Sequence, residues 1–288
     1  MVPDDASKPF DRRQADSWIS DGFILNLTDD YFDEIDELLD ENARLQPLSG
    51  AVLRKFLENR NLEWTYNSNA IEGNTLTLRE TQVVLEGITV GGKTVSEHLE
   101  AINHQHAIEY LYELANGSEP VSERSIKNIH ELILKDIDDE NAGRYRKSNV
   151  KIAGASIVPP DFVLVPEMME RMMMRYEDWK MLYPIVGAAV LHGELVKIHP
   201  FIDGNGRTAR LVMNLVLMKY GYQPVILRKK DRLEYYEALD RATGEDRDYT
   251  SFVRLITRLE KDALVEYSVA LVNASLSNLN DGDGVDIG

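Results

Sequence analysis

The residue types that could do chemistry in this sequence gather in one segment, His199 to Arg210, which reads His-Pro-Phe-Ile-Asp-Gly-Asn-Gly-Arg-Thr-Ala-Arg. Gly204-Asn205-Gly206 precedes an apolar helical pattern, so its N–H groups and the positive end of the helix dipole are expected to form an anion cradle. Arg207 and Arg210 lie three residues apart on the first helical turn, and guanidinium forks suit phosphate oxygens. The segment therefore favours binding of a diphosphate or triphosphate.

Two further residues add catalytic chemistry to this cradle. Asp203 would repel a phosphate unless a divalent cation lay between them, and Mg²⁺ binds one or two carboxylates together with phosphate oxygens. His199 is of a type whose pKa lies near neutrality, so it can take a proton from an incoming hydroxyl. Together these groups favour attack of a hydroxyl on a phosphate ester of Mg-ATP, with the remaining phosphates as the leaving group.

Helical patterns dominate the chain on both sides of this segment. Thr77 with Glu80, and Thr94 with Glu97, form capping boxes, and Ser122 is a typical N-cap. Apolar residues recur at helical spacing over residues 29–39, 51–72, 77–85, 98–114, 126–134, 166–179, 184–198, 208–220, 233–242 and 250–271. The last turn before His199 and the first after Gly206 should therefore belong to two apolar, buried helices.

The stretch from Asn141 to Pro166 differs from the rest. Glycines and prolines punctuate short β-favouring runs such as 150–152 and 156–158, which predicts a small β-hairpin. The expected fold is all-α with one small β-hairpin. Residues 279–288 are acidic and Gly-rich and are expected to be disordered.

The composition narrows the class of protein. The formal net charge is −17, from 32 basic and 49 acidic residues, which argues against a general nucleic-acid binder. The chain has no cysteine, which excludes disulfides, thiolate chemistry and zinc–thiolate sites. The acidic start lacks the apolar core of a signal peptide, and no run is long enough to span a membrane. We therefore expect a cytoplasmic protein without nucleic-acid or membrane partners.

Residues 199–210 match every specified position of the motif H-x-F-x-(D/E)-G-N-G-R-x-x-R, so the chain resembles the Fic domain family from about residue 60 to 260. The resemblance implies a Fic-fold helical bundle with an N-terminal helical region (1–90), a catalytic domain (91–262) and a C-terminal helix end with a tail (263–288). It also implies that the protein is an adenylyltransferase. Such an enzyme transfers AMP from ATP to a Ser, Thr or Tyr hydroxyl of a target protein, or of itself, and releases pyrophosphate.

The same resemblance assigns roles to individual residues. It makes His199 the general base, Phe201 a core anchor and Asp203 the Mg²⁺ ligand. It assigns the phosphates of ATP to Gly204, Asn205, Gly206, Arg207 and Arg210, and the adenine end to Tyr236 and Leu239, with Thr243 where relatives often carry Asn. The predicted hairpin, at about 144–163, would be the flap that aligns the target protein by strand addition.

A second motif indicates control of the activity. Residues 68–73, Ser-Asn-Ala-Ile-Glu-Gly, match the pattern (S/T)-x-x-x-E-(G/N) of the Fic inhibitory helix. Ser68 and Glu72 are i,i+4 neighbours on one helix face. The resemblance implies that Glu72 pairs with Arg210, displaces the γ-phosphate of ATP and so inhibits the enzyme from within its own chain. Homodimers occur in the family and could regulate this helix.

Two other functions stay open at this point. Some relatives with an intact inhibitory glutamate remove AMP from a modified target, using the glutamate to position water. The chain could also be a nucleotide-sensing interaction module with little turnover. The intact His199, Asp203 and both arginines argue against a pure binder, which has no need of a base.

Overall fold

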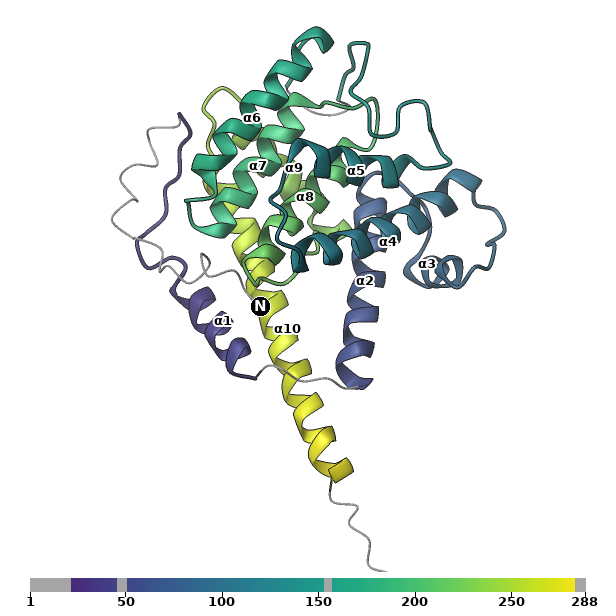
Figure 1. Ribbon diagram of the computed structural model, residues 1–288, viewed down its shortest axis with the longest axis vertical. Coiled ribbons are helices and arrows are strands. Elements are labelled where there is room, and N and C mark those ends of the chain that lie inside the picture. Colours follow the sequence, from purple (N-terminus) through teal and green to yellow (C-terminus); the bar gives the residue numbers. More distant parts are fainter. Residues whose placement is uncertain (1–21, 46–50, 153–156, 283–288) are drawn as a thin grey trace, which may run out of the picture.

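The computed structural model describes residues 22–45, 51–152 and 157–282. In this part of the chain ten α-helices follow one another, joined by loops and two short 3₁₀ turns at Phe162–Leu164 and Lys229–Asp231 (Figure 1). The helices are α1 (Asp33–Leu45), α2 (Ala51–Ile71), α3 (Leu78–Leu85), α4 (Val95–Asn116), α5 (Glu123–Leu134), α6 (Val165–Trp179), α7 (Pro184–Ile198), α8 (Asn205–Lys219), α9 (Arg232–Thr243) and α10 (Thr250–Gly282). The prediction of a helical protein is confirmed.

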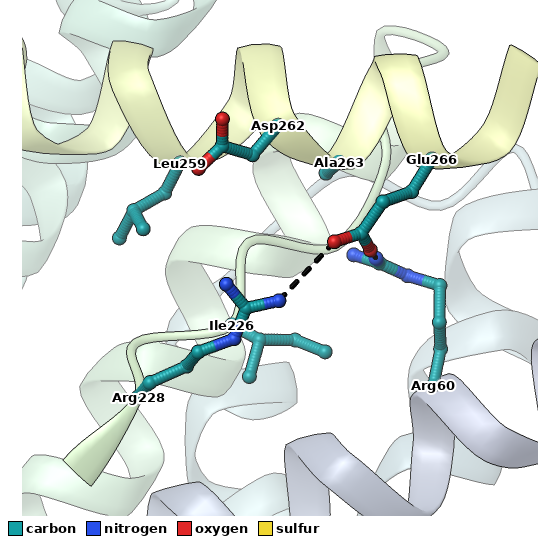
Figure 2. A pocket seen from close by; sticks show the side chains of 7 residues that line it. All are labelled: Arg60, Ile226, Arg228, Leu259, Asp262, Ala263 and Glu266. Atoms are coloured by element: carbon teal, nitrogen blue, oxygen red, sulfur yellow. Dashed lines mark hydrogen bonds and ion pairs between the residues drawn. The ribbon is translucent and has the colours of Figure 1, made fainter. Parts of the chain in front are cut away.

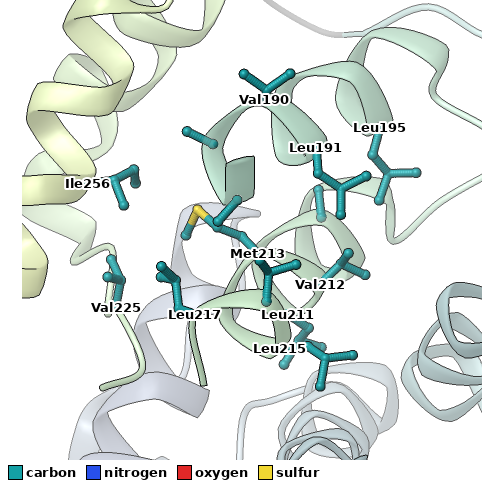
Figure 3. Packing of buried hydrophobic residues seen from close by; sticks show 14 of the residues in the cluster. Val190, Leu191, Leu195, Leu211, Val212, Met213, Leu215, Leu217, Val225 and Ile256 are labelled. Carbon is teal, nitrogen blue, oxygen red and sulfur yellow. The ribbon is translucent and has the colours of Figure 1, made fainter. Parts of the chain in front are cut away.

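Helices α7 and α8 form the centre of the bundle (Figure 1). Their apolar side chains interdigitate with Val225 and with Ile256 of α10 (Figure 3). Small residues let α7 approach its neighbours closely: a Cβ on Gly187 would lie 2.6 Å from the carbonyl oxygen of Trp179, and one on Gly193 would lie 2.5 Å from Tyr249 Oη. The two helices are therefore tightly fixed, and so is the segment that joins them.

Helix α2 buries several polar residues. From its middle onward these are Arg60, Thr65, Asn67, Ser68 and Asn69. Arg60 is 2.5 Å from Glu266 of α10 and donates to the carbonyl of Pro224 at 2.8 Å. Figure 2 shows Arg60 and Arg228 on the two sides of Glu266, which bonds Arg228 at 3.2 Å. This junction anchors α2 to α10.

Helices α3 and α4 begin where the capping boxes predict. Thr77 and Glu80 exchange both capping bonds at the start of α3, and Thr94 and Glu97 do the same at the start of α4. The start of α4 fixes its register, which sets Glu97 and Glu100 beside the turn that follows α2.

The predicted hairpin at about 144–163 is not found among the described residues. No strand occurs in 144–152 or 157–163, and residues 153–156 of the predicted hairpin lie outside the described part. Side chains instead join the two arms: Arg146 donates to the carbonyl of Pro160 at 2.5 Å, and Asn149 Oδ1 accepts from Phe162 N at 2.9 Å. These bonds take the place of a ladder of backbone bonds between the arms.

The C-terminal region also departs from expectation. Helix α10 continues to Gly282, well beyond the predicted end near Leu271, so residues 279–282 of the expected disordered tail are helical and 283–288 lie outside the described part.

The apolar core joins side chains from α1, α2, α7 and α10 in one cluster. No helix among the described residues is long and apolar enough to cross a membrane.

Candidate functional site

The His199–Arg210 segment lies between the end of α7 and the start of α8, and two left-handed residues shape it. His199 ends α7 with φ 50°, and Gly204 begins α8 with φ 72°. A left-handed conformation is costly for most residues and easy for glycine. The chain thus turns twice in six residues and brings the N-terminus of α8 beside His199.

Phe201 anchors the loop from beneath. Its ring is fully buried and stacks on His130 of α5 with 3.6 Å between ring centroids. His130 Nδ1 accepts from Gly143 N at 2.9 Å, which leaves the proton on Nε2, and Nε2 donates to the carbonyl of Asp203 at 3.0 Å. His130 therefore ties the loop to α5 and to the chain leading into residues 144–163.

The side chain of Asn205 bonds the backbone of its own loop. Its Oδ1 accepts from Phe201 N and its Nδ2 donates to Phe201 O, both at 2.9 Å. The side chain thus closes the loop on itself. What Asn205 can offer an anion is its main-chain N–H, in the first turn of α8 with those of Gly206 and Arg207, where helical N–H groups lack intrahelical partners.

His199 is partly buried, with its Nδ1 3.3 Å from the carbonyl of Val196. Donation from Nδ1 leaves Nε2 as the ring's proton acceptor. Burial lowers the pKa of His199, and the nearby Arg146 charge lowers it further, against the opposing effects of Val196 and of the Glu72 and Asp203 carboxylates. The imidazole is therefore neutral near pH 7, the form that a general base requires.

Arg210 is buried on α8 and meets α2, more than a hundred residues away in sequence. Its Nε donates to Ser68 Oγ at 3.1 Å and its Nη2 to Ser68 O at 2.8 Å, while its Nη1 lies 2.7 Å from Glu72 Oε1. Ser68, Glu72 and Arg210 are thus brought together as the sequence motif predicts.

Glu72 also lies over the glycine of the cradle. A Cβ added to Gly206 would collide with Glu72 Oε1 and would lie 3.1 Å from Arg210 Nη1. The carboxylate therefore sits at the N-terminus of α8, where a phosphate would be expected to bind. A carboxylate is itself an anion, so the same dipole and the same arginine attract it.

Arg207 is also buried and meets two carboxylates. Its Nη2 is 3.3 Å from Asp203 Oδ2, and its Nη1 is 3.4 Å from Glu100 Oε1. The Asp203 side chain is 70% exposed, so it is open to a cation from solvent. No group of three metal-binding side chains occurs among the described residues. Asp203 alone fits Mg²⁺, because this ion takes one or two carboxylates with phosphate oxygens and water.

Several residues near the arginines were missed by sequence reasoning. His104 and His192 are fully buried, and burial, aided by the charge of Arg210, lowers both pKa values to about 3. Both imidazoles are therefore neutral near pH 7 and add no second positive charge beside Arg210. His104, His130, His192 and Glu100 belong to helical patterns without a recognisable motif, so only the fold reveals their proximity.

The predicted adenine contacts lie on α9. Leu239 is buried and Tyr236 is 36% exposed, with the Arg232 guanidinium 5.4 Å from its ring centroid. The neighbouring Tyr235 points into the protein, with its hydroxyl 3.1 Å from His192 Nε2. Burial raises the pKa of Tyr235, and the charge of Arg210 opposes this rise. Thr243 donates its hydroxyl to Leu239 O at 2.8 Å.

Comparison with known proteins gives matches over this region and beyond it. The family model described as Fic/DOC family matches residues 120–217. The chain is 38% identical over 249 residues to a protein adenylyltransferase Fic from Nematostella vectensis, covering 83% of this chain and 57% of that protein. It is 35% identical over 254 residues to protein adenylyltransferase fic-1 from Caenorhabditis elegans, covering 86% and 49%. The chain thus spans about half the length of the curated relatives it matches.

Solved structures share the fold. A Fic domain-containing signaling protein from Bacteroides thetaiotaomicron superposes with a TM-score of 0.76 at 29% identity, covering 83% of this chain and 97% of that one. A fragment of Fic-1 from Caenorhabditis elegans superposes with a TM-score of 0.72 at 32% identity, covering 84% and 72%.

Proposed function

Because the chain belongs to the Fic/DOC family, we propose that it transfers AMP from Mg-ATP to a hydroxyl group of a protein and releases pyrophosphate. The observation that carries this proposal is the position of His199, at the left-handed end of α7 and directly before the anion-attracting N-terminus of α8; burial also lowers its pKa, which favours the neutral form that a base requires. In the reaction the hydroxyl oxygen bonds to the α-phosphorus, the bond from that phosphorus to pyrophosphate breaks, and His199 takes the hydroxyl proton. Mg²⁺ held by Asp203 would neutralise phosphate charge.

Labelled ATP tests the reaction class. ATP labelled in the α-phosphate should transfer its label to protein, and ATP labelled in the γ-phosphate should not, because the outer two phosphates leave as pyrophosphate. His199→Ala should abolish the transfer. Retention of the γ-label would instead indicate a kinase, and transfer by His199→Ala would remove His199 as the base.

The segment from 144 to 163 is the part of the chain proposed to dock the target protein. Arg146 and Asn149 hold its two arms by side-chain bonds, and Val158 and Val163 are 85% and 69% exposed. An extended target segment could therefore bond to backbone groups of either arm and cover these valines. The hydroxyl to be modified would belong to a Ser, Thr or Tyr of that segment.

We further propose that Glu72 keeps the resting enzyme inhibited. Its carboxylate contacts Arg210 and lies over Gly206, so it competes with the outer phosphates of ATP for the same positive groups. Glu72→Gly should therefore accelerate self-modification strongly. Glu58→Gly is a matched control, because it introduces the same helix-weakening residue at an exposed position of α2. Equal rates in the two variants would remove the inhibition proposal.

The intact Glu72 also favours a second candidate, removal of AMP from a modified protein. Its carboxylate lies over Gly206 at the N-terminus of α8, the helix that follows His199 in the chain, so a water held by Glu72 could attack the α-phosphorus there. Incubating the unaltered protein with an AMP-modified target separates the two directions. If the unaltered protein releases AMP from the modified target and the Glu72→Gly variant does not, the reaction is hydrolytic.

A further inference from the structure

Arg207 is as buried as Arg210, yet its charge is compensated differently. Both side chains are 3% exposed. Arg207 lies between an exposed carboxylate, Asp203, and a largely covered one, Glu100 of α4, whose side chain is 22% exposed. A buried guanidinium needs carboxylate partners to offset the loss of its hydration.

The two carboxylates that contact Arg207, Asp203 and Glu100, differ in what else they can bind. In the proposed function, which this inference rests on, Asp203 turns to Mg²⁺, and a carboxylate bound to a cation offers less negative charge to an arginine. Glu100 then becomes the carboxylate that keeps Arg207 compensated and aimed at the phosphates. We infer that Glu100 is a positioning residue that holds Arg207 and thereby releases Asp203 to bind the metal.

Glu100 is itself held by the inhibitory segment. Its Oε2 accepts from Asn74 Nδ2 at 2.8 Å, and its carbonyl accepts from Asn69 Nδ2 at 3.2 Å. Asn74 also donates to Glu97 O at 3.0 Å and accepts from Leu76 N at 3.0 Å, so its amide is fixed on both sides. Asn69 and Asn74 flank Glu72 in sequence.

The segment from 69 to 74 therefore reaches both arginines of the motif. Glu72 contacts Arg210 directly, and Asn74 reaches Arg207 through Glu100. Motion of this segment would alter the phosphate site through both arginines and the metal ligand through Glu100. Without metal, Asp203 still compensates Arg207, so the loss of Glu100 should weaken ATP binding mainly when Mg²⁺ is present.

The test measures ATP affinity by calorimetry with Mg²⁺ and in EDTA, in the 288-residue protein carrying Glu72→Gly and His199→Ala so that it binds without turnover. The readout is the ratio of the two affinities. Because residues that orient a metal ligand typically change metal affinity about 10–100-fold, Glu100→Gln should shrink this ratio roughly tenfold. Glu100→Asp, which keeps the charge, should restore part of it.

Glu97→Gln is the matched control: it lies one turn earlier on α4, keeps a side chain suited to the capping box, and has no contact with Arg207 among the bonds of the described residues. A ratio in Glu100→Gln equal to that of this control would overturn the inference. If Glu100→Gln does not fold, Asn74→Ala replaces it, and an unchanged ratio there overturns the coupling equally. A parent that fails to bind Mg-ATP would contradict the proposed function instead.

Discussion

His130 shows how one residue outside the motif can hold the motif in place. It stacks on Phe201, accepts from Gly143 N and donates to Asp203 O. Nothing in the local sequence around residue 130 signals this role, because its partners lie 13 and 73 residues away. Its contribution can be tested because phenylalanine keeps the stacking and removes only the two bonds.

We expect His130→Phe to lower AMP transfer in the Glu72→Gly background by about tenfold or more. Each buried polar group left without a partner costs about 1–3 kcal/mol, and about 1.4 kcal/mol corresponds to tenfold. Transfer rates and urea denaturation should be measured together. His106→Phe, at an exposed position of α4, is the control. A His130→Phe rate equal to that of the control would show that these bonds do not position Asp203.

Sequence reasoning predicted the motif residues better than their surroundings. Ser68, Glu72 and Arg210 meet as the two motifs imply, because a matched pair of motifs carries tertiary information. Glu100 and Asn74 could not be foreseen, since their pairing depends on the packing of α4 beside the end of α2. Asn205 is predicted to bind phosphate as part of the Gly204–Gly206 cradle, and the sequence did not indicate that its side chain would bond to the backbone of Phe201, which leaves its main-chain N–H as the group it can offer.

At the scale of elements, α2 links the site to α10. Ser68, near the C-terminal end of α2, bonds Arg210, and Arg60, in the middle of α2, holds the helix against the rest of the protein. Arg60 contacts Glu266 of α10 and the carbonyl of Pro224 (Figure 2). Glu266 is 43% exposed, so the ion pair contributes only about 1 kcal/mol. Removing the Arg60 contacts should let α2 move, so that the Glu72 carboxylate is displaced from its position over Gly206 for a larger fraction of the time.

Arg60→Met should therefore raise self-modification of the otherwise unaltered protein about fivefold, since about 1 kcal/mol shifts an equilibrium by that factor. In the Glu72→Gly background it should have no such effect, because no carboxylate remains to be released. Initial rates of AMP incorporation in the four proteins check this. The same increase in both backgrounds would mean that Arg60 acts by another route.

The helices were the most predictable elements. Capping boxes at Thr77 and Thr94 fixed two helix starts, and apolar periodicity located the others within a few residues. The hairpin predicted at about 144–163 is not confirmed, since no strand occurs in 144–152 or 157–163, where side-chain bonds of Arg146 and Asn149 join the two arms. Periodicity also ended α10 too early, where polar residues interrupt the apolar pattern.

For the whole molecule, burial of neutral imidazoles makes stability depend on pH. Burial lowers the pKa of His104 and His192 to about 3 and of His130 to about 4, from an ordinary value near 6.5. The unfolded chain therefore takes up protons below pH 6.5 while the folded chain does not. Their contribution is fully present above pH 6.5 and is lost as the pH falls toward 4 for His130 and toward 3 for His104 and His192. Burial raises the pKa of Glu260, which acts in the opposite direction.

Between pH 6 and 5 the free energy of unfolding should fall as the pH falls, because each buried imidazole that stays neutral contributes up to about 1.4 kcal/mol per pH unit, and the raised pKa of Glu260 only opposes part of this change. Urea denaturation at each pH measures this. His104→Leu is the control, because neither ring nitrogen of His104 has a hydrogen-bond partner among the described residues. The slope should fall by about 1.4 kcal/mol per pH unit in that variant. A flat profile in the unaltered protein would contradict these buried neutral imidazoles.

The central claim is that the Glu72 carboxylate and the outer phosphates of ATP compete for one place at the N-terminus of α8. Calorimetric titration of Mg-ATP and of adenosine into His199→Ala protein, with and without Glu72→Gly, tests it most directly. Glu72→Gly should tighten Mg-ATP binding by about tenfold or more and leave adenosine binding unchanged, because only the phosphates meet the carboxylate. Equal Mg-ATP affinity in the two proteins, or an equal gain for adenosine, would contradict it.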